Sequence, residues 1–486
     1  MIENPAVLFL DTARKFPDAL AVYDEESKLK FRDLSRLVLL FAEHMQVCGV
    51  KQHSLVAVHT TDSSIIVVSA LACALLGATW VFADEALESS DAINPTHMLV
   101  TSDAIPDNTK LPIMLVDEAW LKRPLGIATE KAPFFPGFAS ASDDWLLFHS
   151  SGTTGRPKFM ALSCETQLRR FRAIQHEFTP GVSKCVFLFA ANSAPSLMRG
   201  LAGLCWGAAW VFSTDPHFWV DSAVTHVFGS PQQIGYLLSG VPFSKKLGKA
   251  LIGGDGMPDN LASDLLDNFD VVVNTYGSTE ANLIVENQKL RNADGSISTR
   301  TIWYDSEIEI VDEDDTPLSS GQEGIVRVRN PYLVKRYIGA DAAQQAAFRD
   351  GWFYPGDRGV LDQERNFTIC GRLNDRLNIG GVKINAVLLD YIMREIEGVE
   401  DAISFEMPDA DGRPELIAFI KVRPGSYFSD IQKDITIQIA ANLGNSAVPS
   451  RIIDADVIPR TENGKPNRSA CIALVTQARD AQKAAK

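Results

Sequence analysis

The sequence lacks the marks of several common protein classes. Its seven cysteines include no CxxC pair and are odd in number, which disfavours a disulfide framework or a zinc site and favours a reducing compartment. Basic charge is scarce: the net charge of −15 would repel nucleic acid and anionic membranes. No basic stretch followed by an apolar run begins the chain, so no signal peptide is expected. These absences predict a cytoplasmic protein that does not bind nucleic acid.

One apolar segment, Ser64 to Ala83, carries no charged residue, and its length would suit a membrane span. However, Gly77 and Ala78 divide the segment, and no basic residues flank its end. We interpret it as a buried helix that stops at Gly77, followed by a buried strand over 79–83. No membrane span is therefore expected.

The chain of 486 residues is too long for one compact core, so at least two domains are expected. Apolar strands alternate with amphipathic helices through the first part, which is typical of an α/β architecture with largely parallel sheets. Segments 75–83 (LLGATWVFA) and 205–213 (CWGAAWVFS) resemble each other, and each reads as a helix end, a glycine stop and a strand. Two similar α/β subdomains would produce this repeat, although similar packing demands would too.

Later in the chain the pattern changes twice. Turns separate short strands expected over 306–310, 324–330 and 367–370, which indicates a β-rich subdomain. Beyond Arg372, two helices and two strands predict a compact α+β unit of about 110 residues, with a polar tail over 476–486 that is expected to fray. The predicted fold is thus a large N-terminal domain, 1–373, and a small α+β C-terminal domain, 374–486.

The strongest chemical signal is the segment from Phe148 to Lys158, FHSSGTTGRPK, which follows an apolar strand. Glycines let backbone N–H groups approach a polyphosphate, hydroxyls add donors, and Lys158 adds a compensating charge. It is not a Walker A loop, because GxxxxGK[ST] is absent. By composition alone, a flexible surface loop is an equally good interpretation.

Four further motifs follow. NTYGSTE (274–280) comes after an apolar strand and ends in a carboxylate, a ligand type that suits Mg²⁺. GWFYPGD (351–357) ends in Asp357, and a carboxylate can accept two hydrogen bonds from a diol. The last two motifs are GRLNDRLNIGGVKI (371–384) and PRTENGKPNR (459–468).

In this order and at this spacing, the five motifs resemble the ANL superfamily, which comprises acyl- and aryl-CoA synthetases, nonribosomal peptide adenylation domains and luciferases. The resemblance covers nearly the whole chain. It implies an AMP-binding adenylation domain followed by a mobile C-terminal lid domain. It also implies ATP-dependent activation of a small carboxylic acid to an acyl-AMP with pyrophosphate release, then acyl transfer to the thiol of coenzyme A. ATP, Mg²⁺ and coenzyme A are the implied cofactors.

Three alternatives stay open at this point. A stand-alone adenylation enzyme would load an acyl, aryl or amino acid onto the phosphopantetheine arm of an acyl or peptidyl carrier protein. A phosphoryl-transfer enzyme would use the 150–158 segment as a phosphate loop and release ADP. A noncatalytic nucleotide- or acyl-binding protein would release neither pyrophosphate nor ADP.

The resemblance also implies roles for individual residues. Lys465 would be the adenylation lysine, Thr153 a catalytic hydroxyl and Glu280 both catalytic and the Mg²⁺ ligand. Asn374 would be the hinge, and Gly380 and Gly381 would admit the thiol arm. Implied nucleotide-binding residues are Ser150, Ser151, Gly152, Thr154, Gly155, Lys158, Gly254, Asn274, Tyr276, Gly277, Thr279, Asp357 and Arg372. Implied substrate-pocket residues are Ser193, Ala194, Gly229, Gly254, Gly277 and Asn282.

Some positions depart from the family pattern. Pro355 replaces a usual Thr, Asn374 a usual Asp or Lys, and Asn378 a common Lys, which leaves the hinge energetics and the rate of the thiol step open. Ala194 stands where relatives specific for α-amino acids carry an Asp. Because an unpaired buried ammonium would cost several kcal/mol, α-amino acids are disfavoured. The sequence does not identify the acid or the oligomeric state.

Overall fold

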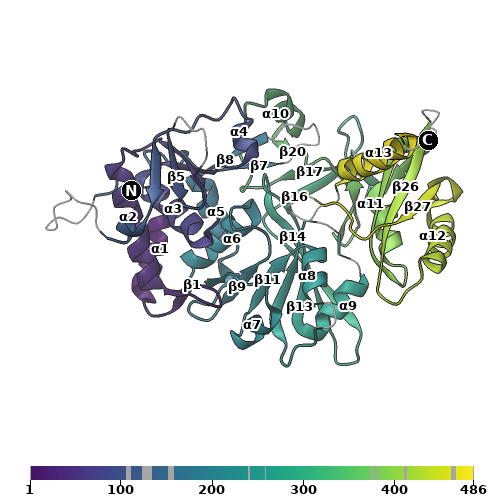
Figure 1. The fold of residues 1–486 in the computed structure, drawn as a ribbon, viewed down its shortest axis with the longest axis horizontal. Helices are drawn as coiled ribbons and strands as arrows, with labels where there is room; N and C mark the ends of the chain where they lie inside the picture. Colours follow the sequence, from purple (N-terminus) through teal and green to yellow (C-terminus); the bar gives the residue numbers. More distant parts are fainter. Residues whose placement is uncertain are drawn as a thin grey trace.

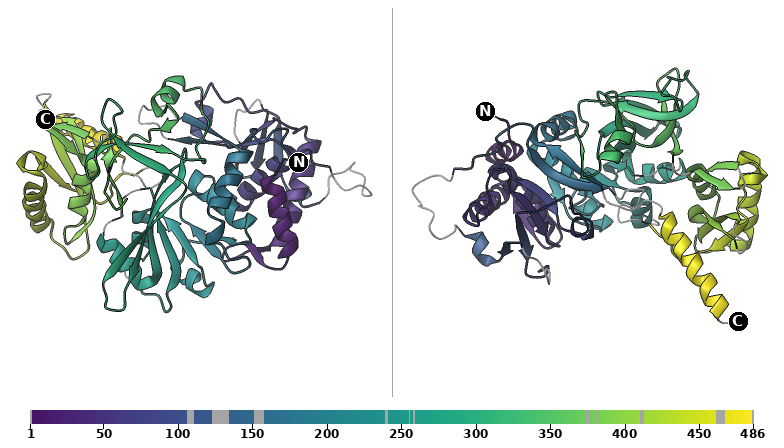
Figure 2. Two further views of the ribbon diagram at one scale, coloured as in Figure 1. Left: turned by 180° about the vertical axis from the view of Figure 1, so that it is seen from behind. Right: turned by 90° about the horizontal axis from the view of Figure 1, so that it is seen from above.

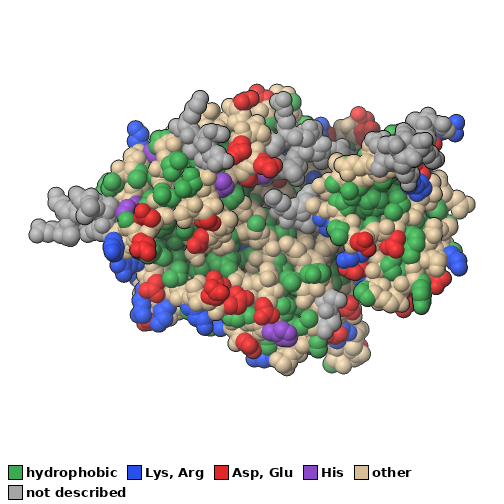
Figure 3. Space-filling view, viewed as in Figure 1, with side chains coloured by type: hydrophobic (Ala, Val, Ile, Leu, Met, Phe, Trp, Pro, Cys, Tyr) green, Lys and Arg blue, Asp and Glu red, His purple; other side chains and the backbone are tan. Residues whose placement is uncertain are grey.

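The computed structural model describes residues 2–105, 111–122, 134–150, 158–238, 241–254, 256–257, 259–373, 376–379, 382–409, 413–460 and 467–484. Two large sheets and a smaller one build the body of the molecule, and the C-terminal residues form a separate lobe at its end (Figure 1). Acidic and basic side chains are interspersed over the face that Figure 3 shows.

A seven-stranded sheet forms the first α/β subdomain. Its central strands run parallel, whereas β8 pairs antiparallel with β7 and with β18. In spatial order the strands are β18 (Tyr337–Ile338), β8 (Lys158–Ser163), β7 (Asp144–Ser150), β4 (Thr79–Phe82), β3 (Leu55–His59), β5 (His97–Thr101) and β6 (Ile113–Val116). The helices α1 (Pro5–Lys15), α2 (Phe31–Val47) and α3 (Ser63–Leu76) pack on one another beside it.

The long apolar segment forms a buried helix and a strand, as predicted. The Asp62 carboxylate caps α3 by accepting hydrogen bonds from the N–H groups of Ser64 and Ile65. Gly77 ends the helix with a φ of 67°, a left-handed conformation that favours glycine. None of the helices within the described residues is long and apolar enough to cross a membrane.

A nine-stranded sheet forms the second α/β subdomain. Its middle strands are parallel, and antiparallel hairpins extend it at both edges. In spatial order the strands are β15 (Ile297–Trp303), β14 (Asn282–Arg291), β13 (Phe269–Ser278), β12 (Leu247–Ile252), β11 (His226–Gly229), β9 (Lys184–Phe187), β10 (Ala209–Val211), β1 (Leu20–Tyr23) and β2 (Lys28–Lys30). The helices α6 (Ala194–Cys205), α7 (Pro216–Asp221), α8 (Pro231–Leu238) and α9 (Asp259–Asn268) accompany this sheet, whereas α5 (Cys164–Ala173) contacts α6 and β8 of the seven-stranded sheet.

The sequence repeat corresponds to equivalent units in the two sheets. Helix α3, Gly77 and β4 form one unit, and α6, Gly207 and β10 form the other. Gly207 has a φ of 81°, close to that of Gly77, and Trp80 and Trp210 are both fully buried. The expectation of two similar α/β subdomains is confirmed.

The predicted β-rich subdomain is a six-stranded sheet. Its strands are β16 (Glu307–Val311), β17 (Glu323–Arg329), β19 (Phe348–Arg349), β20 (Trp352–Phe353), β21 (Asp357–Leu361) and β22 (Phe367–Arg372), with helix α10 (Asp341–Ala347) beside it. A hydrophobic cluster that includes Ile284, Val326 and Phe353 joins this sheet to β14. The β-rich unit is therefore packed on the nine-stranded sheet.

The C-terminal residues have a core of their own. Two hydrophobic clusters contain only residues from Leu377 onward, and the other clusters of the described residues contain none of them. The elements are β23 (Arg376–Ile379), β24 (Val382–Asn385), α11 (Ala386–Arg394), β25 (Val399–Pro408), β26 (Pro414–Val422), α12 (Phe428–Leu443), β27 (Arg451–Asp454) and α13 (Arg468–Ala484). The proposed hinge, Asn374, lies outside the described residues.

The prediction that the tail frays from residue 476 is wrong. Helix α13 continues to Ala484 and extends outward from the rest of the C-terminal lobe (Figure 2). Good helix formers make up this stretch, and Cys471 and Val475, one turn apart, are buried in the core. Arg479 also donates hydrogen bonds to the Pro408 carbonyl and the Glu415 carboxylate. These contacts hold the polar tail as a helix.

Candidate active site

The predicted site residues gather where parallel strands of the nine-stranded sheet end. Strands β11, β12 and β13 run parallel, and Gly229 and Gly254 lie at or just past the ends of the first two. The carboxyl edge of such a sheet is the usual place for ligands. The second motif differs from expectation in one respect: β13 continues through Ser278, so Asn274, Tyr276 and Gly277 lie within the strand.

A tight turn after β13 places Glu280 at its tip. The hairpin shifts register by a bulge between Tyr276 and Gly277, and a Cβ atom on Gly277 would lie 2.2 Å from the Asn282 carbonyl oxygen. Glycine is therefore required at 277. Asn282 itself has a φ of 60°, which asparagine tolerates better than most residues. Thr279 and Glu280 occupy the turn between the strands.

Glu280 is held through its backbone and its side chain. Its carbonyl oxygen accepts hydrogen bonds from the Val334 N–H at 2.8 Å and from Arg170 at 3.0 Å. The same guanidinium donates to the Tyr332 carbonyl at 2.6 Å, and burial lowers the pKa of Arg170 to about 9. The Tyr337 hydroxyl donates to Glu280 Oε1 at 2.7 Å. The carboxylate is thus fixed before any ligand binds.

Three motifs meet at Asp357. Its two carboxylate oxygens lie 2.7 Å from the Tyr276 hydroxyl and 3.0 Å from Arg372 Nε, respectively. Asp357 and Arg372 are register partners in β21 and β22. Burial, and then the Asp357 carboxylate, raise the pKa of Tyr276 well above its usual range, so Tyr276 is the hydrogen-bond donor. The arrangement presents a charged, oriented carboxylate beside an aromatic ring, which suits a ribose next to a base.

Pro355, which stands in place of a usual Thr, keeps the backbone contacts of this segment. Arg372 Nη1 donates to the Pro355 carbonyl at 3.3 Å, and the Leu373 N–H donates to the Gly356 carbonyl at 2.7 Å. Both acceptors are backbone atoms, which any residue type supplies. Proline at 355 therefore keeps this bracing of Arg372, but it lacks the hydroxyl and the backbone N–H of a threonine.

Lys158 begins β8, opposite Ser150 at the end of β7. Its ammonium lies 5.8 Å from the ring centroid of Tyr337, the residue that also contacts Glu280. The structure therefore brings the first and second motifs together through Tyr337. The other residues of the loop, Ser151, Gly152, Thr153, Thr154 and Gly155, lie outside the described residues.

The implied acyl pocket adjoins the amino end of α6. Ser193 is the N-cap residue, and its buried hydroxyl has no hydrogen-bond partner among the described residues. Ala194 begins the helix and is buried. A Cβ on Gly229 would lie 2.9 Å from the Leu188 side chain, so a larger residue there would not fit. This region therefore offers apolar side chains together with the buried Ser193 hydroxyl, which has no partner among the described residues.

The C-terminal motif is anchored at both ends. Arg460 contacts both carboxylate oxygens of Asp401, at 2.6 and 2.7 Å, and Arg468 pairs with the buried Asp390. Burial raises the pKa of Asp390 to about 6 against the opposing effect of Arg468. When the side-chain amide of Gln232 is turned so that its oxygen faces Arg460, that oxygen accepts a hydrogen bond from Arg460 at 3.1 Å. This contact joins the C-terminal lobe to α8. Lys465, Gly380 and Gly381 lie outside the described residues.

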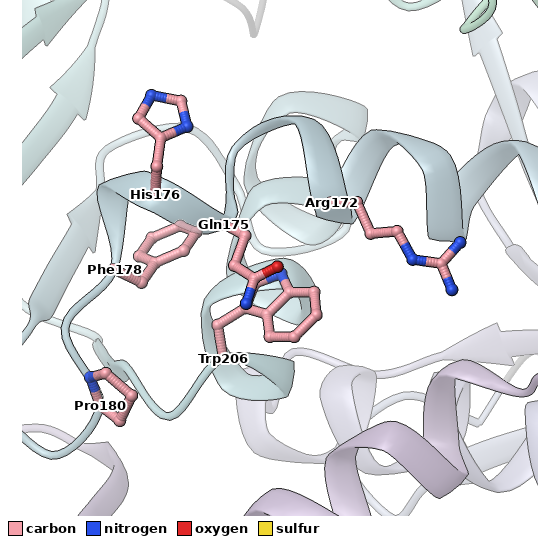
Figure 4. Close-up of a pocket in the computed structure, with 6 residues that line it drawn as sticks. All are labelled: Arg172, Gln175, His176, Phe178, Pro180 and Trp206. Atoms are coloured by element: carbon pink, nitrogen blue, oxygen red, sulfur yellow. The ribbon is translucent and has the colours of Figure 1, made fainter.

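A separate pocket of about 410 Å³ opens between α5 and α6. Figure 4 shows its lining, in which the His176 ring points away from the Trp206 indole. The lining residues are Arg172, Gln175, His176, Phe178, Pro180 and Trp206. None of the predicted site residues is among them, so this pocket is distinct from the motif-bearing site.

Sequence reasoning missed Arg170 and Tyr337. Arg170 sits in an ordinary amphipathic helix, and Tyr337 in an unremarked segment, so neither carries a local signal. Their roles depend on long-range contacts: Arg170 reaches residues 110 and 162 positions away, and Tyr337 pairs through β18 with β8. Only the folded chain reveals them.

Known proteins resemble the chain over most of its length. It is 26% identical to a feruloyl-CoA synthase from Amycolatopsis, covering 93% of this chain and 95% of that protein. It is 23% identical to a D-alanine–D-alanyl carrier protein ligase from Bacillus licheniformis, covering 94% and 98%. Among solved structures, o-succinylbenzoate coenzyme A synthetase from Bacillus subtilis, in complex with ATP and magnesium ion, matches with a TM-score of 0.78 at 20% identity, covering 95% and 98%.

The structural match shows that the fold is shared: a large N-terminal part of mixed α/β sheets and a small C-terminal part. A family description independently covers most of the chain, from residue 9 to residue 338, including the first two motifs and the turn that bears Glu280. The chain therefore belongs to the family of AMP-binding enzymes.

Proposed function

We propose that the protein is an AMP-forming acid–thiol ligase that activates a carboxylic acid with ATP, releases pyrophosphate, and transfers the acyl group to coenzyme A. The observation that carries this proposal is the convergence of Tyr276, Asp357 and Arg372 beside the Glu280 turn, in a chain of the AMP-binding family. This arrangement offers partners for a ribose and for phosphates within one site.

In the first half-reaction, some residues of the chain bind the nucleotide and others stabilise the charge that develops. The Asp357 carboxylate accepts hydrogen bonds from the ribose hydroxyls, and Tyr276 lies along the adenine. The substrate carboxylate attacks the α-phosphorus, and pyrophosphate leaves. Lys158 and Lys465 neutralise the charge that develops, and the 150–158 hydroxyls donate hydrogen bonds to it. Thr279 lies at the α-phosphate. The acyl-AMP that forms is a good acylating agent.

Glu280 fits a magnesium ion. Mg²⁺ is usually bound by one or two carboxylates together with phosphate oxygens, and Glu280 supplies one carboxylate at the tip of a turn. The Tyr337 hydroxyl takes only one of the roughly four lone-pair positions of that carboxylate. When bound, Mg²⁺ would shield the phosphate oxygens and act as a Lewis acid.

In the second half-reaction, a thiol attacks the acyl-AMP carbonyl and AMP leaves. We propose that the C-terminal domain turns about Asn374, so that Lys465 withdraws and Gly380 and Gly381 enter. The separate cores on either side of residues 374–375 support a rigid-body movement of this kind.

Coenzyme A is the proposed acceptor. The feruloyl-CoA synthase relative supports it, because its name states a CoA thioester product. The carrier-protein ligase relative keeps a phosphopantetheine arm as the alternative acceptor. Assays with free coenzyme A and with a carrier protein that bears a free phosphopantetheine thiol, run side by side, separate the two. The proposed substrate is a small carboxylic acid that lacks an α-ammonium group, since Ala194 supplies no counter-charge.

The test is ATP–pyrophosphate exchange over a panel of alkanoic, aryl and amino acids. We expect exchange with at least one acid that has no α-amino group, and release of AMP once the thiol acceptor is added. Release of ADP would overturn the proposal in favour of phosphoryl transfer. Nucleotide binding without exchange for any acid would favour a noncatalytic binding protein.

A further inference from the structure

Tyr337 connects two subdomains at the candidate site. It lies in β18, at the edge of the seven-stranded sheet, and pairs with Met160 of β8. Its hydroxyl reaches across to Glu280, which belongs to the hairpin of the nine-stranded sheet, at 2.7 Å. Its ring lies 5.8 Å from the ammonium of Lys158. One side chain therefore contacts both the proposed metal ligand and a proposed phosphate ligand.

Tyr337 is itself immobilised. The side chain is buried, and its ring packs edge-to-face against Phe348 with centroids 5.6 Å apart. Its backbone N–H donates to the Gln344 side chain at 2.7 Å. In the bond to Glu280, the Tyr337 hydroxyl supplies the hydrogen and the Glu280 carboxylate accepts it.

Glu280 is fixed at two points, its backbone carbonyl and its side-chain carboxylate. Val334 and Arg170 fix its carbonyl oxygen, and Tyr337 fixes its carboxylate. A glutamate at a turn otherwise samples several rotamers, and the loss of that freedom opposes metal binding. Residues that hydrogen-bond a metal-binding carboxylate and orient it commonly strengthen metal binding about 10- to 100-fold. The electron-rich ring face also attracts the Lys158 ammonium.

We propose that Tyr337 is a positioning residue for the nucleotide–metal complex: its hydroxyl sets the Glu280 carboxylate for the divalent cation, and its ring supports Lys158 toward the phosphates. This inference rests on the proposed function, because it takes ATP and a divalent cation as the ligands. It concerns a residue outside the five sequence motifs.

The test is calorimetric titration of ATP into the full-length protein, with Mg²⁺ and with EDTA. Tyr337→Phe keeps the ring and removes the hydroxyl. We expect the dissociation constant of ATP to rise about tenfold in Mg²⁺, the scale of a lost hydrogen bond to a charged group, and to stay unchanged in EDTA. The Mg²⁺ concentration for half-maximal pyrophosphate exchange should rise in parallel.

Tyr332→Phe is the matched control. Tyr332 lies on the same segment, but its hydroxyl donates to Asp305 at 3.0 Å rather than to Glu280. We expect wild-type binding of Mg²⁺ and ATP in this variant. In a Glu280→Gln background, Tyr337→Phe should add little, because the two changes remove the same interaction. Melting temperatures of all variants establish that each is folded.

The outcomes separate the two proposals. A wild-type protein that binds ATP no better with Mg²⁺ than with EDTA would overturn the proposed function and this inference with it. A Mg²⁺-dependent wild type together with a Tyr337→Phe variant that matches it, or that weakens equally in EDTA, would overturn the role of Tyr337 alone. Additive effects of the Tyr337 and Glu280 changes would also overturn it.

Discussion

The Tyr276 hydroxyl donates a hydrogen bond to the Asp357 carboxylate at 2.7 Å, although the two residues lie 81 positions apart in the chain. Tyr276 belongs to β13 of the nine-stranded sheet, and Asp357 begins β21 of the β-rich subdomain. This bond therefore joins two separately built sheets at the proposed ribose site, so their relative placement sets the direction in which the carboxylate faces.

The first prediction follows from that bond. Tyr276→Phe keeps the ring but removes the hydroxyl that orients Asp357, while the ion pair with Arg372 stays in place. A hydrogen bond to a charged group contributes about 1.5–3 kcal/mol, so we expect the KM for ATP in pyrophosphate exchange to rise about tenfold or more, with a smaller change in kcat. Tyr354→Phe is the control, since its hydroxyl contacts Arg327 at 3.3 Å elsewhere in the β-rich sheet. Equal KM values in the two variants would refute a role for the bond.

Local patterns predicted most of the fold. The strands at 20–23, 55–59 and 113–116 begin and end where the apolar runs do, and Gly77 stops its helix by adopting the left-handed conformation that the sequence implied. These features depend on nearest neighbours along the chain. They are readable because apolar periodicity and glycine act locally.

What the sequence could not predict depends on pairing between distant segments. The extension of β13 through Ser278 requires β14 as its partner, and the helical tail requires the Pro408 carbonyl and Glu415 as hydrogen-bond acceptors. In the site, the motifs identified Glu280 and Asp357, but not the side chains that orient them. Arg170 and Tyr337 act through contacts that no local spacing encodes. The positions of Lys465, Thr153 and Gly380 stay predictions.

A second prediction concerns packing under the proposed acyl pocket. A Cβ on Gly200 of α6 would lie 2.1 Å from the buried Trp210 ring. Overpacking of this kind typically costs about 1–3 kcal/mol, so Gly200→Ala should lower the melting temperature. On the same helix, a Cβ on Gly203 would meet its nearest neighbour, Ala208, at 3.5 Å. Gly203→Ala should therefore stabilise the protein by about 0.5–1 kcal/mol through helix propensity. Thermal unfolding of the pair checks both signs, and a stabilising Gly200→Ala would contradict the packing.

A third prediction concerns how the stability of the protein falls as the pH becomes acidic. Burial, with Lys249 and Arg199 nearby, lowers the pKa of His226 from 6.5 to about 3. Below about pH 6.5 the unfolded chain binds a proton at His226. In the folded protein His226 stays neutral until the pH approaches 3. The contribution of His226 to the free energy of unfolding is therefore at its maximum above about pH 6.5 and declines as the pH falls toward 3.

The expected slope from this one residue is up to about 1.4 kcal/mol per pH unit. His226→Gln should make the fall in melting temperature between pH 7 and pH 5 shallower. His217→Gln, at an exposed position, should leave the slope as it is. Parallel pH profiles for His226→Gln and the wild type would show that His226 titrates normally.

The last prediction separates the two half-reactions. If Lys465 neutralises charge only while pyrophosphate leaves, Lys465→Ala should reduce pyrophosphate exchange by several orders of magnitude and yet keep much of the transfer from preformed acyl-AMP to the thiol. Lys433→Ala is the control, because Lys433 is an exposed lysine of the same lobe, on α12. It should change neither half-reaction. Arg460 and Arg468, which anchor the segment on both sides, are unchanged in the Lys465 variant, so a loss confined to exchange reports the ammonium itself. Equal losses in both half-reactions would count against the rotation of the C-terminal domain, since that rotation requires Lys465 to be absent from the second step.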